Sequence, residues 1–413
     1  MSCSGTRVLL PAALLLLRGA EPDQEELLVQ LADGKTHVGK VVDWTRDGIA
    51  LRLAVGKRTF RPAELLFFQA PAKRLREPAP MIVDLRDGTR LQGKILGGDQ
   101  DGDHLQLENG IFALESIQLD RIRQILVARE GRFPAPGQLR LKSDPTEQWD
   151  ILFRRAPYGV DPIEGSIHRV SREGIHFASR HREDSPELFK WEEIGAARIE
   201  GEASRERTES GSLVILTADG SLLRGVAVEL NRAMLGLETP QLGRLDIPVA
   251  EILAGHVEEG QRSWLSELEP TSVEERSFPA GTEAPLLFPF HRDESVIGQP
   301  LAVRSSYWTR GLGCHSYSKL SYRVPAGMRR FLCWVGADDS ALGSEPPGNM
   351  SFRILLDGKL EAERPSVKGG QAASRIAPIA VKGGQLLTLE LGFGEDLLFS
   401  GDRGNWLCPV LLR

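Results

Sequence analysis

Three of the five Asp-Gly dipeptides in the first 260 residues share one sequence context, between stretches in which apolar and polar residues alternate. The glycines of these dipeptides are Gly34, Gly88 and Gly220, and each is followed by another glycine five residues later. Asp-Gly in this setting is a strong β-hairpin signal, because glycine tolerates the positive φ that a two-residue hairpin turn requires. This part of the chain is therefore constrained to fold as a series of antiparallel hairpins.

The hairpins belong to a longer repeated unit. Each unit continues through a third strand and closes with a segment of similar sequence, such as residues 60–67 and 247–252. This order of elements predicts a small barrel of five strands in about 50 residues, which in shape resembles the Sm-like and SH3-like barrels. We expect four such units, in residues 25–70, 80–128, 149–200 and 211–257. The third is a degenerate copy, because Tyr158-Gly159 replaces its Asp-Gly turn.

The residue types in these units do not indicate a ligand. Single-stranded nucleic acid is bound by basic surfaces with interleaved aromatic residues, and the repeats lack such a surface. The formal net charge of the chain is −6, which also disfavours a phosphate backbone as a partner. We therefore expect the units to be a spacer or an interaction scaffold, with envelope proteins as candidate partners.

Residues 1–20 have the organisation of a secretory signal peptide. Arg7 supplies the positive start, residues 8–17 are continuously apolar, and Ala20 is a small residue at a cleavage point. We expect export, with a secreted, periplasmic or cell-envelope location; retention of the segment as an anchor is the alternative. No later apolar run reaches the length of a transmembrane span.

Three cysteines remain beyond the signal segment, namely Cys314, Cys333 and Cys408. An odd number of cysteines cannot all pair within one chain, and no C-x-x-C motif indicates zinc or redox chemistry. One disulfide with one thiol, or three buried thiols, both fit this count.

The last 150 or so residues have the strand spacing of a β-sandwich. Alternating runs occupy residues 330–335, 351–356 and 386–391, and no stretch has a helical period. The expected fold class of the whole chain is therefore all-β, with several small barrels followed by a sandwich in residues 262–413.

Six short motifs in this region occur in a fixed order. They are Trp264-Leu-Ser-Glu-Leu-Glu-Pro270, Arg292-Asp-Glu-Ser-Val-Ile-Gly-Gln-Pro-Leu301, Gly311-Leu-Gly-Cys-His-Ser316, Val335-Gly-Ala-Asp-Asp339, Phe352-Arg-Ile-Leu-Leu-Asp-Gly358 and Gly401-Asp-Arg-Gly-Asn-Trp406. Together they resemble the NPCBM domain, a carbohydrate-binding type of module found beside glycoside hydrolase family 98 catalytic domains. The resemblance implies a galactose-binding-like jelly roll and a glycan as ligand. The last motif departs from the family pattern Asp-His-Ala-Asp-Trp, because Arg403 and Asn405 replace the histidine and the second carboxylate.

The candidate sugar-binding residues are side chains at turns or strand ends of this region. Sugar sites combine an aromatic face for the ring with carboxylate, amide or imidazole groups for the hydroxyls. The candidates are Trp308, His315, Asp338, Asp402, Asn405 and Trp406.

Each candidate also has a structural alternative. Trp406 begins an alternating apolar run and can lie in the core, and His315 can hydrogen-bond the backbone of its own loop. The aspartates can bind loop amides instead of a ligand. Asp338, Asp339 and Asp402 also have the oxygen chemistry that calcium requires, although no metal ligand is assigned.

No catalytic motif is present in the sequence. A nucleophile elbow, a P-loop, an H-E-x-x-H motif and a dinucleotide-binding fingerprint are all absent. The expected protein is an exported, non-catalytic carbohydrate-binding protein. The alternative is a structural or protein-interaction component of the bacterial envelope whose sandwich does not bind sugar.

Overall fold

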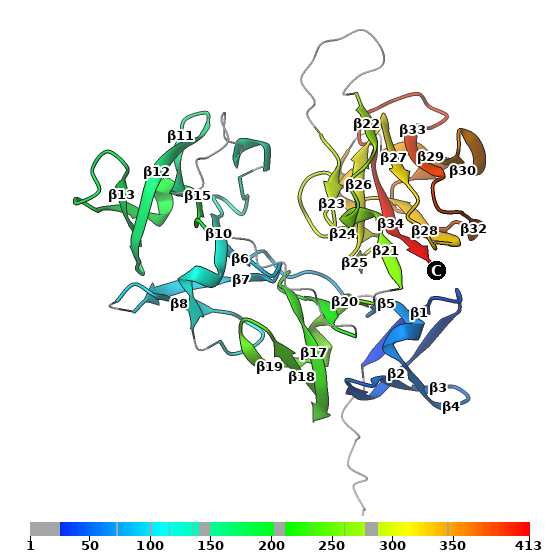
Figure 1. Cartoon of the computed structure of the whole chain (residues 1–413), viewed down its shortest axis with the longest axis horizontal. Helices are drawn as coiled ribbons and strands as arrows, with labels where there is room; N and C mark the ends of the chain where they lie inside the picture. Colours follow the sequence, from blue (N-terminus) through cyan, green and yellow to red (C-terminus); the bar gives the residue numbers. More distant parts are fainter. Residues whose placement is uncertain are drawn as a thin grey trace, which may run out of the picture.

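The computed structural model of the chain consists of β-strands joined by loops and short 3-10 turns (Figure 1). It describes residues 25–413 apart from 72, 100, 115, 135, 140–148, 202–210, 232, 260, 277–287 and 345–346. The predicted signal segment, residues 1–20, lies outside the described residues. Within them there is no α-helix, so none could cross a membrane. The all-β prediction is confirmed.

The chain from Glu26 to Val257 forms four units with the same order of five strands. In every unit the first strand pairs with the second and the fifth, and the second, third and fourth strands pair in succession. A 3-10 turn separates the fourth strand from the fifth.

The bounds of these elements follow in chain order. The first unit contains β1 (Glu26–Leu31), β2 (Thr36–Thr45), β3 (Gly48–Leu53), β4 (Gly56–Phe60), η1 (Pro62–Glu64) and β5 (Leu65–Gln69). The second contains β6 (Met81–Leu85), β7 (Arg90–Gly98), β8 (His104–Glu108), β9 (Ile117–Gln118), η2 (Leu119–Arg121) and β10 (Ile122–Val127), and η3 (Pro136–Leu139) follows it. The third contains β11 (Asp150–Ala156), β12 (Gly159–Val170), β13 (Gly174–Ser179), β14 (Glu187–Lys190), η4 (Trp191–Glu193) and β15 (Ile194–Arg198). The fourth contains β16 (Leu213–Thr217), β17 (Leu222–Asn231), β18 (Met234–Thr239), β19 (Gly243–Pro248), η5 (Val249–Glu251) and β20 (Ile252–Val257).

The three Asp-Gly turns are stabilised in the same way. The aspartate Oδ1 accepts a hydrogen bond from the backbone N–H two residues later, over 2.9 Å for Asp33, 2.8 Å for Asp87 and 3.0 Å for Asp219. The glycines that follow have φ of +93°, +87° and +88°, which residues with a Cβ rarely adopt. The recurring carboxylates are therefore explained by turn chemistry without a ligand.

The glycine five residues later is required for a different reason. A Cβ on Gly39, Gly93 or Gly225 would lie 2.7, 2.4 or 2.4 Å from a carbonyl oxygen of the third strand. In the degenerate unit the equivalent distance, at Gly165, is 2.0 Å. The second strand of every unit therefore needs a glycine where it bends across the third.

The units associate in two pairs through their fifth strands. In the first pair, units one and four, β5 and β20 are antiparallel neighbours, with Phe67 opposite His256. In the second pair, units two and three, β10 pairs with β15, with Gln124 opposite Arg198. Each fifth strand is thus hydrogen-bonded on both edges, and no fifth strand is an exposed edge.

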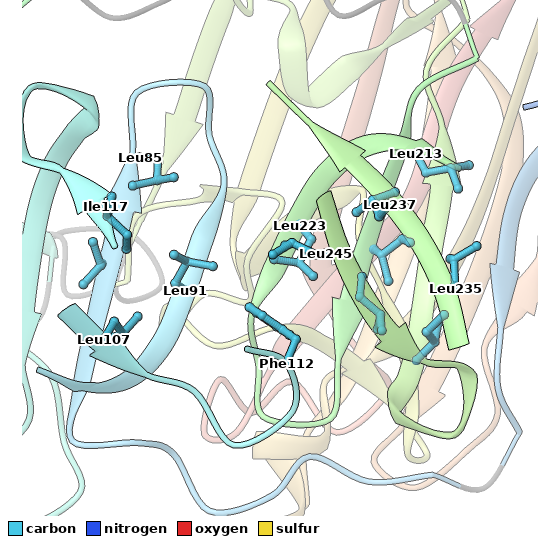
Figure 2. Packing of buried hydrophobic residues seen from close by; sticks show 14 of the residues in the cluster. Leu85, Leu91, Leu107, Phe112, Ile117, Leu213, Leu223, Leu235, Leu237 and Leu245 are labelled. Carbon is cyan, nitrogen blue, oxygen red and sulfur yellow. The ribbon is translucent and has the colours of Figure 1, made fainter. Parts of the chain in front are cut away.

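The two pairs also contact each other, through units two and four. Figure 2 shows Phe112 of unit two beside Leu223 and Leu245 of unit four, and all three belong to one buried cluster. Near this contact Asn109 Nδ2 donates to Asp219 Oδ2 over 2.7 Å, so a loop of unit two holds the Asp-Gly turn of unit four.

The C-terminal region is a sandwich of two antiparallel sheets and a separate hairpin. One sheet contains β21 (Arg262–Trp264), β23 (His291–Arg292), β26 (Gly311–His315), β28 (Arg330–Ala337), β31 (Ser374–Arg375), β32 (Ile379–Ala380) and β34 (Arg403–Leu412). The other contains β22 (Ser272–Glu275), β27 (Ser318–Arg323), β29 (Asn349–Leu356), β30 (Lys359–Lys368) and β33 (Leu386–Phe393). The hairpin is β24 (Leu301–Val303) and β25 (Ser306–Trp308), and two 3-10 turns complete the region, η6 (Leu265–Glu267) and η7 (Asp339–Gly343). Cys314, Cys333 and Cys408 are buried free thiols, as in the second of the two alternatives.

The sandwich is docked on the outer face of the β5–β20 pair, which is the face turned away from the unit cores (Figure 1). The Phe67 ring lies 4.5 Å from Trp308 and 5.2 Å from Trp334, measured between ring centroids. Beside them Gln69 Nε2 donates to the Tyr307 carbonyl over 2.6 Å. These buried aromatic contacts hold the sandwich in one orientation on the first pair.

A buried arginine ties the same surfaces together. Arg310 of the sandwich donates from Nε to His256 Nε2 over 2.9 Å and from Nη2 to Glu258 Oε1 over 2.5 Å. It also donates to Asp293 over 2.8 Å and to Glu267. Burial, with the Arg310 charge, lowers the pKa of His256 to about 4, so the imidazole is neutral and accepts from Arg310.

We predict that Arg310→Met uncouples the sandwich from the first pair. The variant removes Arg310 from the largely buried Glu258 and leaves Arg224, 3.5 Å away, as its remaining ion-pair partner. Removing one partner of a buried ion pair costs up to about 3–5 kcal/mol. In denaturant titrations followed by tryptophan fluorescence, Trp308 and Trp334 should become exposed before the rest of the chain unfolds. Arg330→Met removes an exposed arginine of the same domain and should leave the curve unchanged. Identical curves for both variants would contradict this view of the junction.

Candidate functional site

Four of the six predicted site residues meet at one end of the seven-stranded sheet. β34 lies between β26 and β28, which places His315 opposite Arg403 and Gly336 opposite Asn405. Asp402 immediately precedes β34, and Asp338 immediately follows β28. We call His315, Asp338, Asp402 and Asn405, with the neighbouring Arg403, the strand-end cluster.

His315 is held as a neutral hydrogen-bond acceptor. Its Nδ1 lies 2.7 Å from the Ser316 carbonyl oxygen, so Nδ1 carries the proton and donates it. Burial, together with the charge of Arg403, lowers the pKa of the imidazole. Nε2 is then an acceptor, and the described part of the chain offers it no hydrogen-bond partner. The sequence suggested two roles for this histidine, a hydrogen bond to its own loop and contact with a ligand. The first uses Nδ1, and the second would use Nε2.

Phe288 covers this histidine and was not identified from the sequence. Its ring is stacked on the imidazole, with centroids 5.0 Å apart and planes 11° apart. The Arg403 guanidinium lies 5.7 Å from the same ring, and its Nη1 donates to the Ser340 carbonyl over 3.1 Å. Phe288 belongs to none of the six motifs, and only its aromatic character next to a proline marks it in the sequence.

Asp402 ties two corners of the sandwich together. Its Oδ2 accepts from Ser316 Oγ over 2.8 Å and its Oδ1 accepts from the Asn349 N–H over 3.0 Å. The residue is fully buried, and this burial raises the pKa of its carboxyl to about 7. Asp402 therefore supports the backbone beneath His315.

Asp338 and Asn405 form a second buried pair in the cluster. Asn405 Nδ2 donates to Asp338 Oδ2 over 2.7 Å, and Asp338 Oδ1 accepts from the Ser340 N–H at the start of η7. Burial raises the pKa of Asp338. Asn405 Oδ1 is buried and has no partner among the described residues. An amide at position 405 thus supplies the donor that a second carboxylate would lack.

The two predicted tryptophans lie elsewhere. Trp406 is completely buried between the two sheets, where its ring meets Phe352 edge-on at 5.0 Å. This is the core position kept open as its alternative. Trp308 is 5% exposed and packs against Phe67 and Trp334 at the junction with the first pair. In this arrangement neither ring has a face free for a sugar.

The carboxylates considered for calcium are engaged separately. Asp339 accepts from the backbone N–H groups of Arg304 and Ser305 over 2.6 and 2.7 Å. Asp338 and Asp402 have the partners described above. Within the described ranges, no three His, Cys, Asp or Glu side chains are grouped so as to hold a metal ion.

Comparison with protein families identifies the C-terminal region. Residues 261–412 match the profile of the NPCBM/NEW2 domain, so the predicted resemblance is confirmed for this part of the chain. The match supports a carbohydrate-binding module in the C-terminal region. Among curated proteins, no relative of the chain was found.

Several solved carbohydrate-binding modules are similar to the chain. A CBM51 module from Clostridium perfringens GH95, in complex with methyl-galactose, is 21% identical, with 36% of this chain and 99% of that chain covered and a TM-score of 0.31. The CBM51-2 and INT domains of Clostridium perfringens ZmpB, in complex with GlcNAc, are 18% identical, with coverage of 44% and 36% and a TM-score of 0.32. The chain thus spans about a third of the length of that structure. The CBM36 module in complex with calcium and xylotriose is 12% identical, with coverage of 36% and 96% and a TM-score of 0.20.

The raised pKa of Asp402 gives a testable pH dependence. Its carboxyl titrates near 3.8 in the unfolded chain and near 7 in the folded one, so between these values only the folded state keeps the proton. Its stabilising contribution is therefore present at about pH 4 and is lost as the pH rises towards about 7. Asp402→Asn has no proton to lose, so the free energy of unfolding of the wild type should fall relative to that of the variant over this range.

Urea unfolding at several pH values measures this difference, and the other titrating groups cancel because both proteins contain them. Asp161→Asn is the matched control, because Asp161 is an exposed aspartate of β12 in the third unit. A pH-independent difference between the wild type and Asp402→Asn would show that this carboxyl is not protonated in the folded state.

Proposed function

We propose that the chain is an exported, non-catalytic carbohydrate-binding protein whose sandwich binds a glycan at the strand-end cluster. The family match of residues 261–412 supports the class of module. The observation that carries the location is the His315 imidazole, which is oriented by Ser316 and leaves Nε2 as an acceptor for a sugar hydroxyl.

The remaining groups of the cluster fit supporting roles in this proposal. The Arg403 guanidinium is partly exposed beside Phe288 and can donate to sugar oxygens. Asp338, Asp402 and Asn405 are nearly or fully buried, so they position the loops around His315. Phe288 is the aromatic ring of the site, in place of the buried Trp308 and Trp406.

The four barrel units act as a mount for the sandwich in this proposal. Because the sandwich is docked on β5 and β20 through Phe67 and Arg310, the units fix the direction in which the glycan site points. A flexible spacer would leave that direction free.

One observation favours the alternative of a structural envelope component. Phe288 is stacked on the face of His315, and the histidine is only 9% exposed. A sandwich that has lost its ligand would show the same closed site. The two functions are separated by the binding experiment below.

We predict that His315→Ala weakens glycan binding by about two- to tenfold, the effect of losing one neutral hydrogen bond. The full chain is first tested on a glycan array, and the sugars that bind are then titrated by calorimetry. His181→Ala is the matched control, because His181 is an exposed histidine in the third unit.

The outcomes of this experiment are distinct. Binding that is weakened in His315→Ala and unchanged in His181→Ala supports the strand-end cluster. An affinity equal to that of the wild type in both variants would place the glycan site elsewhere. An array without any bound sugar would favour the envelope component.

We further propose that the module does not depend on calcium. Since Asp338, Asp339 and Asp402 each accept protein hydrogen bonds, added calcium or a chelator should leave the melting temperature unchanged. A melting temperature that rises with calcium concentration would contradict this, because a ligand that binds the folded state stabilises it.

A further inference from the structure

The two pairs of units present equivalent outer faces. In the first pair the face contains Phe67, Gln69, Ala254 and His256, and the sandwich covers it. The equivalent positions in the second pair are occupied by Gln124, Leu126, Ala196 and Arg198, because β10 and β15 pair in the same manner as β5 and β20. Two like units joined antiparallel through the same strand are related by an approximate twofold axis. The outer face of the second pair is therefore the internal counterpart of a known docking surface.

A cavity of about 480 Å³ lies over this second face. Gln124, Leu126 and Arg198 line it from β10 and β15, and Ile82 lines it from β6. The opposite wall is the loop before β24, with Ile297 and Gln299. Its size falls in the range of small-molecule sites, which is about 300–1,000 Å³.

The apolar part of the wall is closed by Phe133 and Leu139, which follow β10. They pack against Ile82, Leu126 and Phe153. Arg198 lies at the edge of this apolar region, with Nη2 donating to the Leu139 carbonyl over 3.2 Å. The cavity thus has an apolar floor next to a guanidinium.

The charge of the cavity is opposite to that of the chain. Its lining contains Arg90, Arg132, Arg198 and Glu294, a formal charge of +2 in a chain of net charge −6. Arg90 is held by Asp84 and Glu294, but Arg132 and Arg198 form no ion pair with any carboxylate in the described part of the chain.

The environment of Arg198 disfavours its own charge. Burial and the nearby Arg123 lower the pKa of its guanidinium. A bound anion would offset both effects.

The covered face shows how its central position is used. There Arg310 of the docked sandwich donates to His256 and to Glu258 of the fourth unit. On the second face the position equivalent to His256 is itself a guanidinium, Arg198, and the exposed Glu200 at the position equivalent to Glu258 forms no ion pair with it in the described part of the chain. A partner that binds Arg198 as Arg310 binds the first face is therefore an anion.

We propose that this cavity is a binding site for a small organic anion, in which Arg198 and Arg132 bind a carboxylate or phosphate and the floor of Leu126 and Phe133 packs against an apolar part. The site is separate from the strand-end cluster, so it stands or falls independently of the glycan function. Trigalacturonate, benzoate and phenyl phosphate serve as probes, with neutral galactotriose as the uncharged counterpart. They distinguish an acidic sugar, a simple carboxylate and a phosphate as sources of the anion.

Calorimetry on the full chain tests the proposal. At least one anionic probe should bind at submillimolar concentration, galactotriose should not bind this cavity, and added salt should weaken the binding. Arg198→Gln should weaken it by about ten- to a hundredfold, the effect of losing one charge-assisted hydrogen bond. Arg154→Gln is the matched control, because Arg154 is an exposed arginine of β11 outside the cavity lining.

A second variant blocks the cavity without changing its charge. Ile297→Trp enlarges a side chain that is 38% exposed at the wall, so it should abolish probe binding while circular dichroism stays unchanged. His315→Ala should leave probe binding intact. The proposal is overturned if no anionic probe binds, if Arg154→Gln weakens binding as much as Arg198→Gln, or if Ile297→Trp binds like the wild type.

Discussion

The antiparallel pairing of β5 with β20 is the interaction on which the arrangement of the whole chain depends. These strands close units one and four, which are separated by two other units in the sequence, and their pairing joins the two barrels into one continuous sheet. The same pairing creates the outer face that receives Trp308, Trp334 and Arg310 from the sandwich. An unpaired β5 would expose both a strand edge and a set of large apolar side chains. The orientation of the proposed glycan site therefore depends on a contact between two barrels that do not themselves contribute to the site.

The elements of the fold were predictable where the signal is local. The conformation of an Asp-Gly turn can be predicted from its own two residues, because the aspartate side chain accepts a backbone hydrogen bond within the turn and the glycine supplies the positive φ. The five-residue spacing to Gly39, Gly93 and Gly225 marks a bend against the third strand. The pairing of units was not predictable in the same way, because it depends on the register between strands far apart in the chain. The sequence does contain one sign of this pairing. The run Leu65-Leu-Phe-Phe-Gln69 does not alternate between apolar and polar residues, which is typical of a strand buried on both faces, and every one of its residues is buried in the structure.

The candidate site was predictable in part for the same physical reason. His315, Asp338, Asp402 and Asn405 lie at strand ends, and the order of strands in the sandwich collects those ends in one place. Trp308 and Trp406, by contrast, are buried away from these four residues. A tryptophan near a turn has the same sequence signature whether it stacks on a sugar or fills an interface, and the partner of Trp308 is Phe67, about 240 residues earlier. Phe288 was missed because its stacking on His315 joins two residues that are separated in the sequence and meet only in the tertiary fold.

The two outer faces show how a repeated unit can acquire different surfaces without a change of fold. The core positions of the fifth strands stay apolar in all four units, as Leu65, Ile122, Ile194 and Ile252 show, because each must fill its own barrel. The outer positions carry no such constraint. At one of them the first pair has His256 and the second has Arg198, and this single difference changes a neutral acceptor into a cation. A guanidinium that approaches His256 would be repelled at Arg198, so the second face cannot receive the same partner as the first.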